Sequence, residues 1–295
     1  MWKKLQKQSV RRWTLTLRNR TAYLFLLPSL VGTAVFVLIP FADVIRRSFF
    51  KAVGNTFVGL TNYQDVLENK AFQQAALHTL KFLSICLPLL LALSFGAALL
   101  LYHIPTGKAF FQTVFLLPMA VPVASLVVFW KIMFHGNGLL NEVLELVHLH
   151  GMDWMNTKAS FWILVFSYIW KNLGYDVVLW VAALSGIGEE QYEAAKVSGA
   201  GNKECFFYIT LPQMKSGIVM IGVLSFVNAF RVFREAYLIA GDYPHESIYM
   251  LQHLFNNWFT KLDTQKMSAA AVMMAAVVSI LLYILEHWNE KQEID

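Results

Sequence analysis

The chain has 295 residues, of which 57% are hydrophobic and only 15% are charged, and its mean hydropathy is +0.50. This composition excludes an ordinary water-soluble domain and predicts a protein that crosses a membrane several times. A net charge of +5 and a pI near 9.1 could indicate nucleic-acid binding, but the basic residues lie in flanks and loops. A membrane topology explains that distribution better, so we expect lipid and no nucleic acid as a partner.

The first 20 residues form a basic tail without any acidic residue. Its cations are Lys3, Lys4, Lys7, Arg11, Arg12, Arg18 and Arg20. Such a segment is typical of a cytoplasmic topology anchor. The apolar run that follows is long enough to span a bilayer, which disfavours a cleaved signal peptide. We therefore expect the tail to remain in the mature protein.

Six apolar segments follow, each near the roughly 20 residues that a bilayer crossing needs. They are predicted at Tyr23–Val44, Leu77–Tyr102, Phe110–Phe134, Phe161–Leu184, Ser216–Leu238 and Met267–His287. The sequence therefore predicts an all-α membrane protein with one six-helix domain over residues 21–290, between cytoplasmic tails at 1–20 and 291–295.

The distribution of Lys and Arg sets the predicted orientation. With the N-terminus inside, twelve of these residues lie on the cytoplasmic side and seven lie outside, Arg46 and Arg47 included. Because positive residues gather on the cytoplasmic side, both termini are predicted to lie there. The same topology places the loop between the fourth and fifth spans, residues 185–213, in the cytoplasm.

That loop is polar in a chain that is otherwise apolar. Its first half, Glu189–Val197, combines helix formers with acidic residues in the first turn, and Gly199 and Gly201 provide a stop. A second short helix is predicted before Pro212. An ordinary solvated loop is the alternative, but the ordered pattern makes two helices around a glycine turn the better interpretation.

Three short motifs in this loop carry a resemblance to a known family. Glu193-Ala194-Ala195, then Gly199-Ala200, then Ile209-Thr210-Leu211-Pro212 resemble the EAA loop of ABC importer permeases, most of all those of the maltose type. The resemblance implies the type I permease fold and a loop that sits in a groove of a separate ATPase subunit. The coupling residues that it implies are Glu193, Ala194, Ala195, Gly199, Ala200, Leu211 and Pro212. Ser198 departs from the usual Asp, and Gly188 from a frequent Pro.

The first outer loop supports the same resemblance. Gly59-Leu60-Thr61-Asn62-Tyr63 is similar to a turn of the sugar-permease branch, and His78-Thr79-Leu80 to the start of its second helix, with His78 in place of Asn. Pro28 and Pro40 in the first span also fit that branch. The resemblance covers most of the chain and weakens after Gly241.

Pro118 and Pro122 lie inside the third predicted span. Each removes a backbone hydrogen bond and is expected to bend the helix. A helix that lines a pathway and a helix that is merely kinked for packing remain equal alternatives.

Polar and ionisable residues inside the fourth and fifth spans are the candidates for a translocation pathway, because a charge in lipid usually faces a partner or a cavity. These candidates are Asn172, Tyr175, Asp176, Asn228, Arg231, Arg234 and Glu235. In the alternative interpretation Arg231 and Glu235 neutralise each other at i, i+4, while Lys171 and Arg234 extend to the membrane surface.

In maltose-type permeases the sugar contacts come from the helices on either side of the coupling loop, so the resemblance implies contacts near Asn172–Tyr175 and Asn228–Arg231. Two arginines exceed what a neutral sugar requires. We therefore hypothesise an acidic substrate, for which a guanidinium group is suited.

Catalytic and metal-binding patterns are incomplete. Gly107-Lys108 lacks the remaining residues of a phosphate loop, so ATP hydrolysis is expected of a partner. His245-Glu246 resembles the start of a zinc helix, but position 249 is Tyr. His148 and His150 have no Cys or carboxylate cluster beside them, so no metal site is predicted. We expect no cofactor on this chain and no catalytic residue.

The sequence as a whole predicts the permease subunit of an ATP-driven importer of sugars or oligosaccharides in a prokaryotic cell membrane. The expected partners are a second homologous permease, two ATPase subunits that bind ATP and Mg, and an extracytoplasmic solute-binding protein. A homodimeric permease remains open. An ATP-independent, ion-coupled carrier or channel is the main alternative, and a membrane-bound enzyme is a weaker one.

Overall fold

A computed structural model describes residues 23–104, 106–232, 236–237 and 244–294. The chain divides into two compact units, residues Met1–Val66 with Asp263–Ala275, and Leu67–Leu262 with Ala276–Asp295. Within the described residues the regular structure is helical, apart from one isolated bridge between Phe50 and Phe57.

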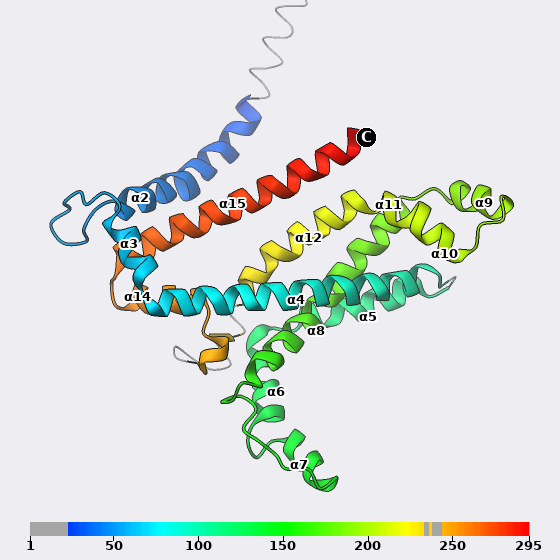
Figure 1. Ribbon diagram of the computed structural model, residues 1–295, viewed down its shortest axis with the longest axis horizontal. Helices are drawn as coiled ribbons and strands as arrows, with labels where there is room; N and C mark the ends of the chain where they lie inside the picture. The colour runs from blue at the N-terminus through cyan, green and yellow to red at the C-terminus, as the bar shows by residue number, and fades with distance from the viewer. Residues whose placement is uncertain (1–22, 105, 233–235, 238–243, 295) are drawn as a thin grey trace, which may run out of the picture. The chain divides into compact units, whose positions relative to one another are not determined.

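The helices follow the predicted order, with several short interruptions (Figure 1). Those up to α8 are η1 (Ala34–Leu38), α2 (Ile39–Ser48), α3 (Thr61–Glu68), α4 (Lys70–Tyr102), α5 (Lys108–Ala120), α6 (Val123–Phe134), α7 (Leu139–Leu146) and α8 (Ser160–Ser185). Those after it are α9 (Glu189–Val197), α10 (Asn202–Cys205), η2 (Phe206–Thr210), α11 (Leu211–Gln213), α12 (Lys215–Ala229), η3 (Phe230–Val232), η4 (Glu246–Ile248), α14 (Leu251–Thr260) and α15 (Thr264–Ile294).

Four of the described helical stretches are long and apolar enough to cross a membrane: Tyr23–Ser48, Lys70–Tyr102, Val123–Leu146 and Thr264–His287. A fifth crossing is obtained if Asn202–Gln213 and Lys215–Ala229, which meet at a 61° bend, count as one span. Helix α8 covers the fourth predicted span but does not meet this criterion, because Lys171, Asn172 and Asp176 lower its hydropathy. The predicted number of six spans is therefore not reproduced by length and composition alone.

The third predicted span, Phe110–Phe134, is broken rather than continuous. Helix α5 ends at Ala120, Val121 is extended at φ −70° and ψ 127°, and α6 begins after Pro122. A proline disfavours helical backbone in the residue before it, which accounts for the break. Pro118, by contrast, lies inside α5.

Prolines also explain two π turns. Pro40 follows η1 and Pro212 follows η2, in each case as the second residue after the turn. The backbone N–H of the residue before each proline, Ile39 or Leu211, bonds five residues back instead of four. Proline has no N–H to donate to the preceding turn of the helix, and the helix widens to a π turn directly before it.

In the first unit, the turn that resembles the sugar-permease branch closes the end of α2. The buried Asn62 amide donates to the carbonyl oxygens of Ser48, at 2.9 Å, and Phe50, at 3.1 Å. The Tyr63 hydroxyl lies 2.6 Å from Ser48 Oγ. Gly59 has a positive φ of 57°, which a residue with a side chain rarely adopts. The Gly and Asn of this turn therefore have structural roles.

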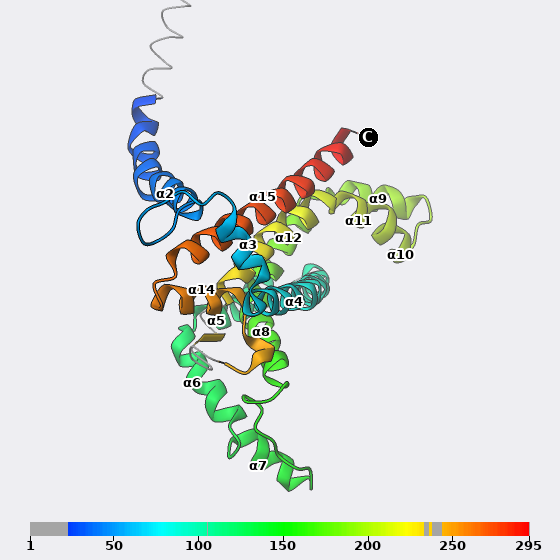
Figure 2. The same cartoon turned by 60° about the vertical axis from the view of Figure 1, so that its left-hand side comes forward.

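In the second unit, α8 lies beside α4 and α5 in both views (Figure 1 and Figure 2). Two buried tryptophans of this core donate hydrogen bonds to serines of neighbouring helices. Trp180 on α8 donates to Ser94 on α4, at 3.0 Å, and Trp130 on α6 donates to Ser167 on α8, at 2.7 Å. Because these polar groups are satisfied in pairs, they fix the helix register inside an apolar core.

Helices α5 and α8 approach each other closely at Gly174. A β-carbon added there would lie 1.7 Å from the carbonyl oxygen of Phe115. This site excludes every side chain, because the atom in the way belongs to a helix backbone. Gly174 lies between Asn172 and Asp176, so the crossing fixes the part of α8 that carries the predicted pathway residues.

The two ends of the second unit have different surroundings. The loop α9–α11 lies near the end of α4 at Tyr102, whereas η4 and α14 lie near its beginning (Figure 1). At the beginning of α4, Thr79 Oγ1 accepts a 3.0 Å bond from the Leu251 N–H, and Phe72 stacks on Trp258.

The turn that leads into α8 is stabilised by Asp153. Its carboxylate accepts bonds from the N–H groups of Met155 and Asn156 and from the Asn156 side chain. The Asn156 amide, followed by these backbone donors, holds the pKa of Asp153 below its usual value. The turn thereby fixes the chain just before Lys158.

Candidate functional site

The loop α9–α11 contains the predicted two helices and the glycine turn between them. The Gly199 N–H donates to Lys196 O at 3.0 Å, and the Ala200 N–H donates to Ala195 O at 2.9 Å. This pair of bonds is the Schellman motif, and Gly199 adopts the left-handed conformation that the motif requires, with φ +86°. The Gly-Ala pair of the sequence motif is thus the C-terminal cap of α9.

The two departures from the family pattern are accommodated locally. The Ser198 hydroxyl donates to Ala194 O at 3.0 Å, a bond that an ionised Asp could not donate. Gly188 precedes α9 with an extended backbone, φ −64° and ψ 131°, which proline also adopts.

Side-chain hydrogen bonds tie the two halves of the loop together. The hydroxyl of Tyr192, on α9, lies 2.9 Å from Thr210 Oγ1, on η2, and Thr210 in turn lies 3.4 Å from Cys205 O. The Gln213 amide donates to the Gln191 side-chain oxygen. The loop is therefore a braced unit, although sequence analysis singled out neither Tyr192 nor Gln191.

Several apolar side chains of this braced loop point into solvent. Val197 is 90% exposed, Tyr208 81% and Phe207 59%. The loop also borders a cavity of about 510 Å³ against the end of α4, lined in part by Glu193, Lys196 and Tyr102. Exposed apolar groups on an ordered polar loop are typical of a surface that another protein covers.

An aromatic series connects the loop with the core. The Phe206 ring centroid lies 6.3 Å from that of Phe95 on α4, and Phe95 lies 5.0 Å from Trp180 on α8. Because Trp180 also bonds to Ser94, the loop, α4 and α8 are in continuous contact.

The helices before and after the loop, α8 and α12, are antiparallel neighbours. A β-carbon added at Gly217 would lie 3.3 Å from Ala183 Cβ, and further along the pair Ser225 donates to the Asp176 carboxylate at 2.8 Å. Both Asp176 and Ser225 are 1% exposed. A buried polar pair of this kind fixes the contact between the two helices.

The predicted pathway residues have different environments. Asn172 is half-buried and donates to Tyr168 O of its own helix at 2.8 Å, and Tyr175 and Asn228 are half-buried. Asn172 is one turn from Asp176, and Asn228 is one turn from Ser225, so both asparagines lie on the same side of the Asp176–Ser225 bond. The side chain of Asp176, in contrast, is enclosed within the chain.

Arg231, Arg234 and Glu235 complete the set of predicted pathway residues. The backbone of Arg231 belongs to η3. Arg234 and Glu235 lie outside the described residues. The assignment of these residues, and of the other pathway candidates, to a translocation pathway stays a prediction.

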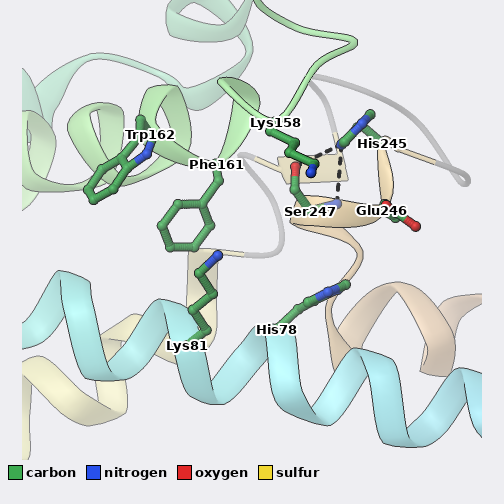
Figure 3. Close-up of a pocket in the computed structure, with 8 residues that line it drawn as sticks. All are labelled: His78, Lys81, Lys158, Phe161, Trp162, His245, Glu246 and Ser247. Carbon is green, nitrogen blue, oxygen red and sulfur yellow. Dashed lines mark hydrogen bonds between the residues drawn. The ribbon is translucent and has the colours of Figure 1, made fainter.

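A second cavity, of about 390 Å³, lies where η4 approaches the beginnings of α4 and α8 (Figure 3). We call it the η4 cavity. It is lined by His78, Lys81, Lys158, Phe161, Trp162, His245, Glu246 and Ser247. Sequence analysis singled out His78, His245 and Glu246 separately, without bringing them together.

The sequence carried weak signals for the residues that were missed. Ser225 precedes Asn228 by three positions and shares its helix face. Lys81 is a lysine inside the second predicted span, which is itself an indication of function. For Gly174, only the crossing with α5 reveals the constraint.

Comparisons with known proteins agree with this architecture. Residues 84–293 match the family described as binding-protein-dependent transport system inner membrane component. A probable ABC transporter permease of Bacillus subtilis (strain 168) is 29% identical, over 90% of this chain and 94% of the relative. A trehalose/maltose transport system permease of Thermococcus litoralis is 30% identical, over 88% and 90%.

A solved bacterial ABC transporter involved in the import of the acidic polysaccharide alginate has the same fold. Its matching chain gives a TM-score of 0.82 at 22% identity, over 95% of this chain and 99% of that chain. The family match covers well over half of the sequence and includes both the α9–α11 loop and the helices on either side of it. The chain therefore belongs to the family of binding-protein-dependent transport system inner membrane components, the permease subunits of ABC transporters.

Proposed function

We propose that this chain is the permease subunit of an ATP-driven, binding-protein-dependent importer of sugars or oligosaccharides, and that the α9–α11 loop is the docking site for its ATPase. The observation that carries the proposal is the construction of the loop. It is braced internally by Tyr192 and Thr210, yet it leaves Val197 90% exposed. A rigid element with an uncovered apolar residue is suited to transmit the motion of a partner.

The mechanism that we propose is alternating access. Movement of the ATPase displaces the α9–α11 loop, and the loop transmits the displacement through Phe206, Phe95 and Trp180 and through its covalent continuity with α8 and α12. The Asp176–Ser225 bond keeps these two helices in contact while they tilt. Asn172, Tyr175, Asn228 and Arg231 are the proposed contacts with the substrate.

The proposed assembly has six crossings in this chain with both termini in the cytoplasm, a second permease, two ATPase subunits and an extracytoplasmic binding protein. ATP and Mg belong to the ATPase subunits. A periplasmic binding protein is part of a solved alginate transporter complex with this fold, which supports that partner. The cell membrane of a prokaryote is the proposed location.

Sugars are the proposed substrate class because similar permeases bear such names. They include the trehalose/maltose permease and a sulfoquinovosyl glycerol permease of Agrobacterium fabrum, which is 30% identical over 93% of this chain. A sn-glycerol-3-phosphate permease of Escherichia coli is also similar, at 28% identity. The substrates in the names of these relatives include both neutral and acidic compounds.

The test is uptake by the complete transporter in proteoliposomes. Sugar should accumulate only with internal ATP and with the binding protein outside, and Glu193→Ala should abolish accumulation while the transporter remains assembled in the membrane. Accumulation that continues without ATP and follows an ion gradient would contradict the proposal and favour an ion-coupled carrier.

A further inference from the structure

The η4 cavity combines cationic and aromatic groups. Lys81 and Lys158 contribute two ammonium groups, against a single carboxylate from Glu246. In Figure 3 the Glu246 side chain points away from Phe161 and Lys81. Within the described part of the chain, neither lysine forms an ion pair with a carboxylate. Among the described residues that line it, the cavity therefore carries an excess of positive charge.

The aromatic groups have a complementary arrangement. The Lys81 ammonium lies 4.7 Å from the centroid of Phe161, which holds it at the cavity by a cation–π contact and leaves N–H donors available. The neighbouring Trp162 is 58% exposed, so one large ring surface is uncovered. Ring faces stack on sugars, and ammonium groups bind acidic groups.

The walls of the cavity are fixed by hydrogen bonds. His78 Nδ1 donates to Tyr249 O at 3.2 Å, which joins α4 to the segment after η4. Ser247 Oγ lies 3.0 Å from Ser160 Oγ on α8 and 2.8 Å from His245 Nδ1. These bonds hold the cavity walls in place, and a preorganised site lowers the cost of binding a ligand.

We infer that the η4 cavity is a binding site for an anionic saccharide, in which Lys81 and Lys158 bind the acidic group and Trp162 stacks on a sugar ring. The inference rests on the proposed function and narrows it, because it adds the charge of the substrate. In the predicted topology the cavity faces the outer side, so the saccharide would occupy it before reaching Asn172 and Asn228.

The direct test is binding of a short oligouronate to the full-length chain in nanodiscs, compared with a neutral oligosaccharide of the same length. The double variant Lys81→Gln/Lys158→Gln should weaken oligouronate binding about tenfold, since two partly solvated ionic contacts are lost, and leave neutral binding unchanged. Trp162→Ala should weaken both. The control is Lys261→Gln, which removes an exposed lysine on the same predicted side and should have no effect.

Uptake by the complete transporter gives a second readout. In the double variant KM for the oligouronate should rise with kcat unchanged. Unaltered oligouronate binding in the double variant would overturn the inference. So would an equal loss of acidic and neutral uptake with poorer recovery of the binding protein, because the cavity would then be a protein contact. If the wild-type chain binds the oligouronate but the complete transporter accumulates no sugar, the cavity would be supported and the proposed function contradicted.

Discussion

Helix α8 and the α9–α11 loop are consecutive in the chain, but α8 buries many of its side chains within the chain whereas the loop leaves most of its side chains exposed. Half of the 26 residues of α8 are buried, including the polar residues Ser167 and Asp176, each of which has a partner in the chain. Helix α9 has no buried residue, and Val197 at its end is almost fully exposed. Substitutions in α8 should therefore act on folding, whereas those in the loop should act on assembly and coupling.

The largest effect is expected at Gly174. Gly174→Ala would place a methyl group against the Phe115 carbonyl and force α5 away from α8, at a cost of about 3 kcal/mol or more. Thermal unfolding of the purified protein in detergent should show a large decrease in Tm. The matched control is Gly222→Ala on α12, where nothing lies within 4 Å, and a decrease there of similar size would contradict the packing argument.

The buried pair between α8 and α12 should give the next largest effect. Ser225→Ala leaves the Asp176 carboxylate buried without its hydroxyl donor, which costs about 1–3 kcal/mol. Asp176→Asn keeps an acceptor oxygen for Ser225 and should cost less. The order of the two unfolding temperatures tests this directly, and a reversed order would show that the hydrogen bond is not what joins the helices.

In the loop, Gly199→Val should separate coupling from stability. A β-branched residue at φ +86° is strained by roughly 1–2 kcal/mol, so the cap of α9 opens while the core is untouched. Substrate-stimulated ATPase activity of the complete transporter should fall strongly, with Tm nearly unchanged. Gly188→Ala, at an ordinary φ, serves as the control. A large decrease in Tm for Gly199→Val would contradict this prediction, because a substitution in the loop would then act on folding as substitutions in α8 do.

The smallest effect is expected for Tyr192→Phe, which removes only the hydroxyl that braces α9 against η2. Losing one half-buried hydrogen bond costs about 0.5–1.5 kcal/mol, confined to the loop. Hydrogen exchange in residues 189–197 should quicken while exchange in α8 stays the same. Faster exchange throughout α8 would mean that the loop supports the helix, contrary to the comparison.

The same contrast explains what could be predicted from sequence. The α9–α11 loop has local signals, an acidic first turn, glycines and a proline, and α9 has the predicted bounds. The second helix is also present, but it continues through Pro212 to Gln213 rather than ending before the proline. The constraints on α8 come from other helices. Gly174 must be glycine because Phe115 on α5 lies against it, and Asp176 can be buried because Ser225 on α12 donates a hydrogen bond to it. Such contacts cannot be deduced from helical spacing. The break at Val121 was only partly predicted. Pro118 and Pro122 were both expected to bend the third span, but the helix ends before Pro122 and continues through Pro118.

The η4 cavity illustrates the same limit. Its residues come from three segments far apart in the chain, and each was interpreted alone: His78 as a departure from Asn, and His245-Glu246 as an incomplete zinc motif. Only the fold places them beside Lys81 and Trp162. Polar residues that match no motif singly can still form one site.

The measurement that tests the central claim most directly is the recovery of an ATPase subunit with the tagged chain from mild detergent, identified by mass spectrometry. We predict recovery with the wild type and an approximately tenfold loss with Val197→Asp, because the 90% exposed valine lies where the partner would cover it. Val53→Asp, at an 89% exposed valine in the first predicted outer loop, should retain the subunit. Equal recovery with Val197→Asp and the wild type, or no ATPase with either, would contradict the account.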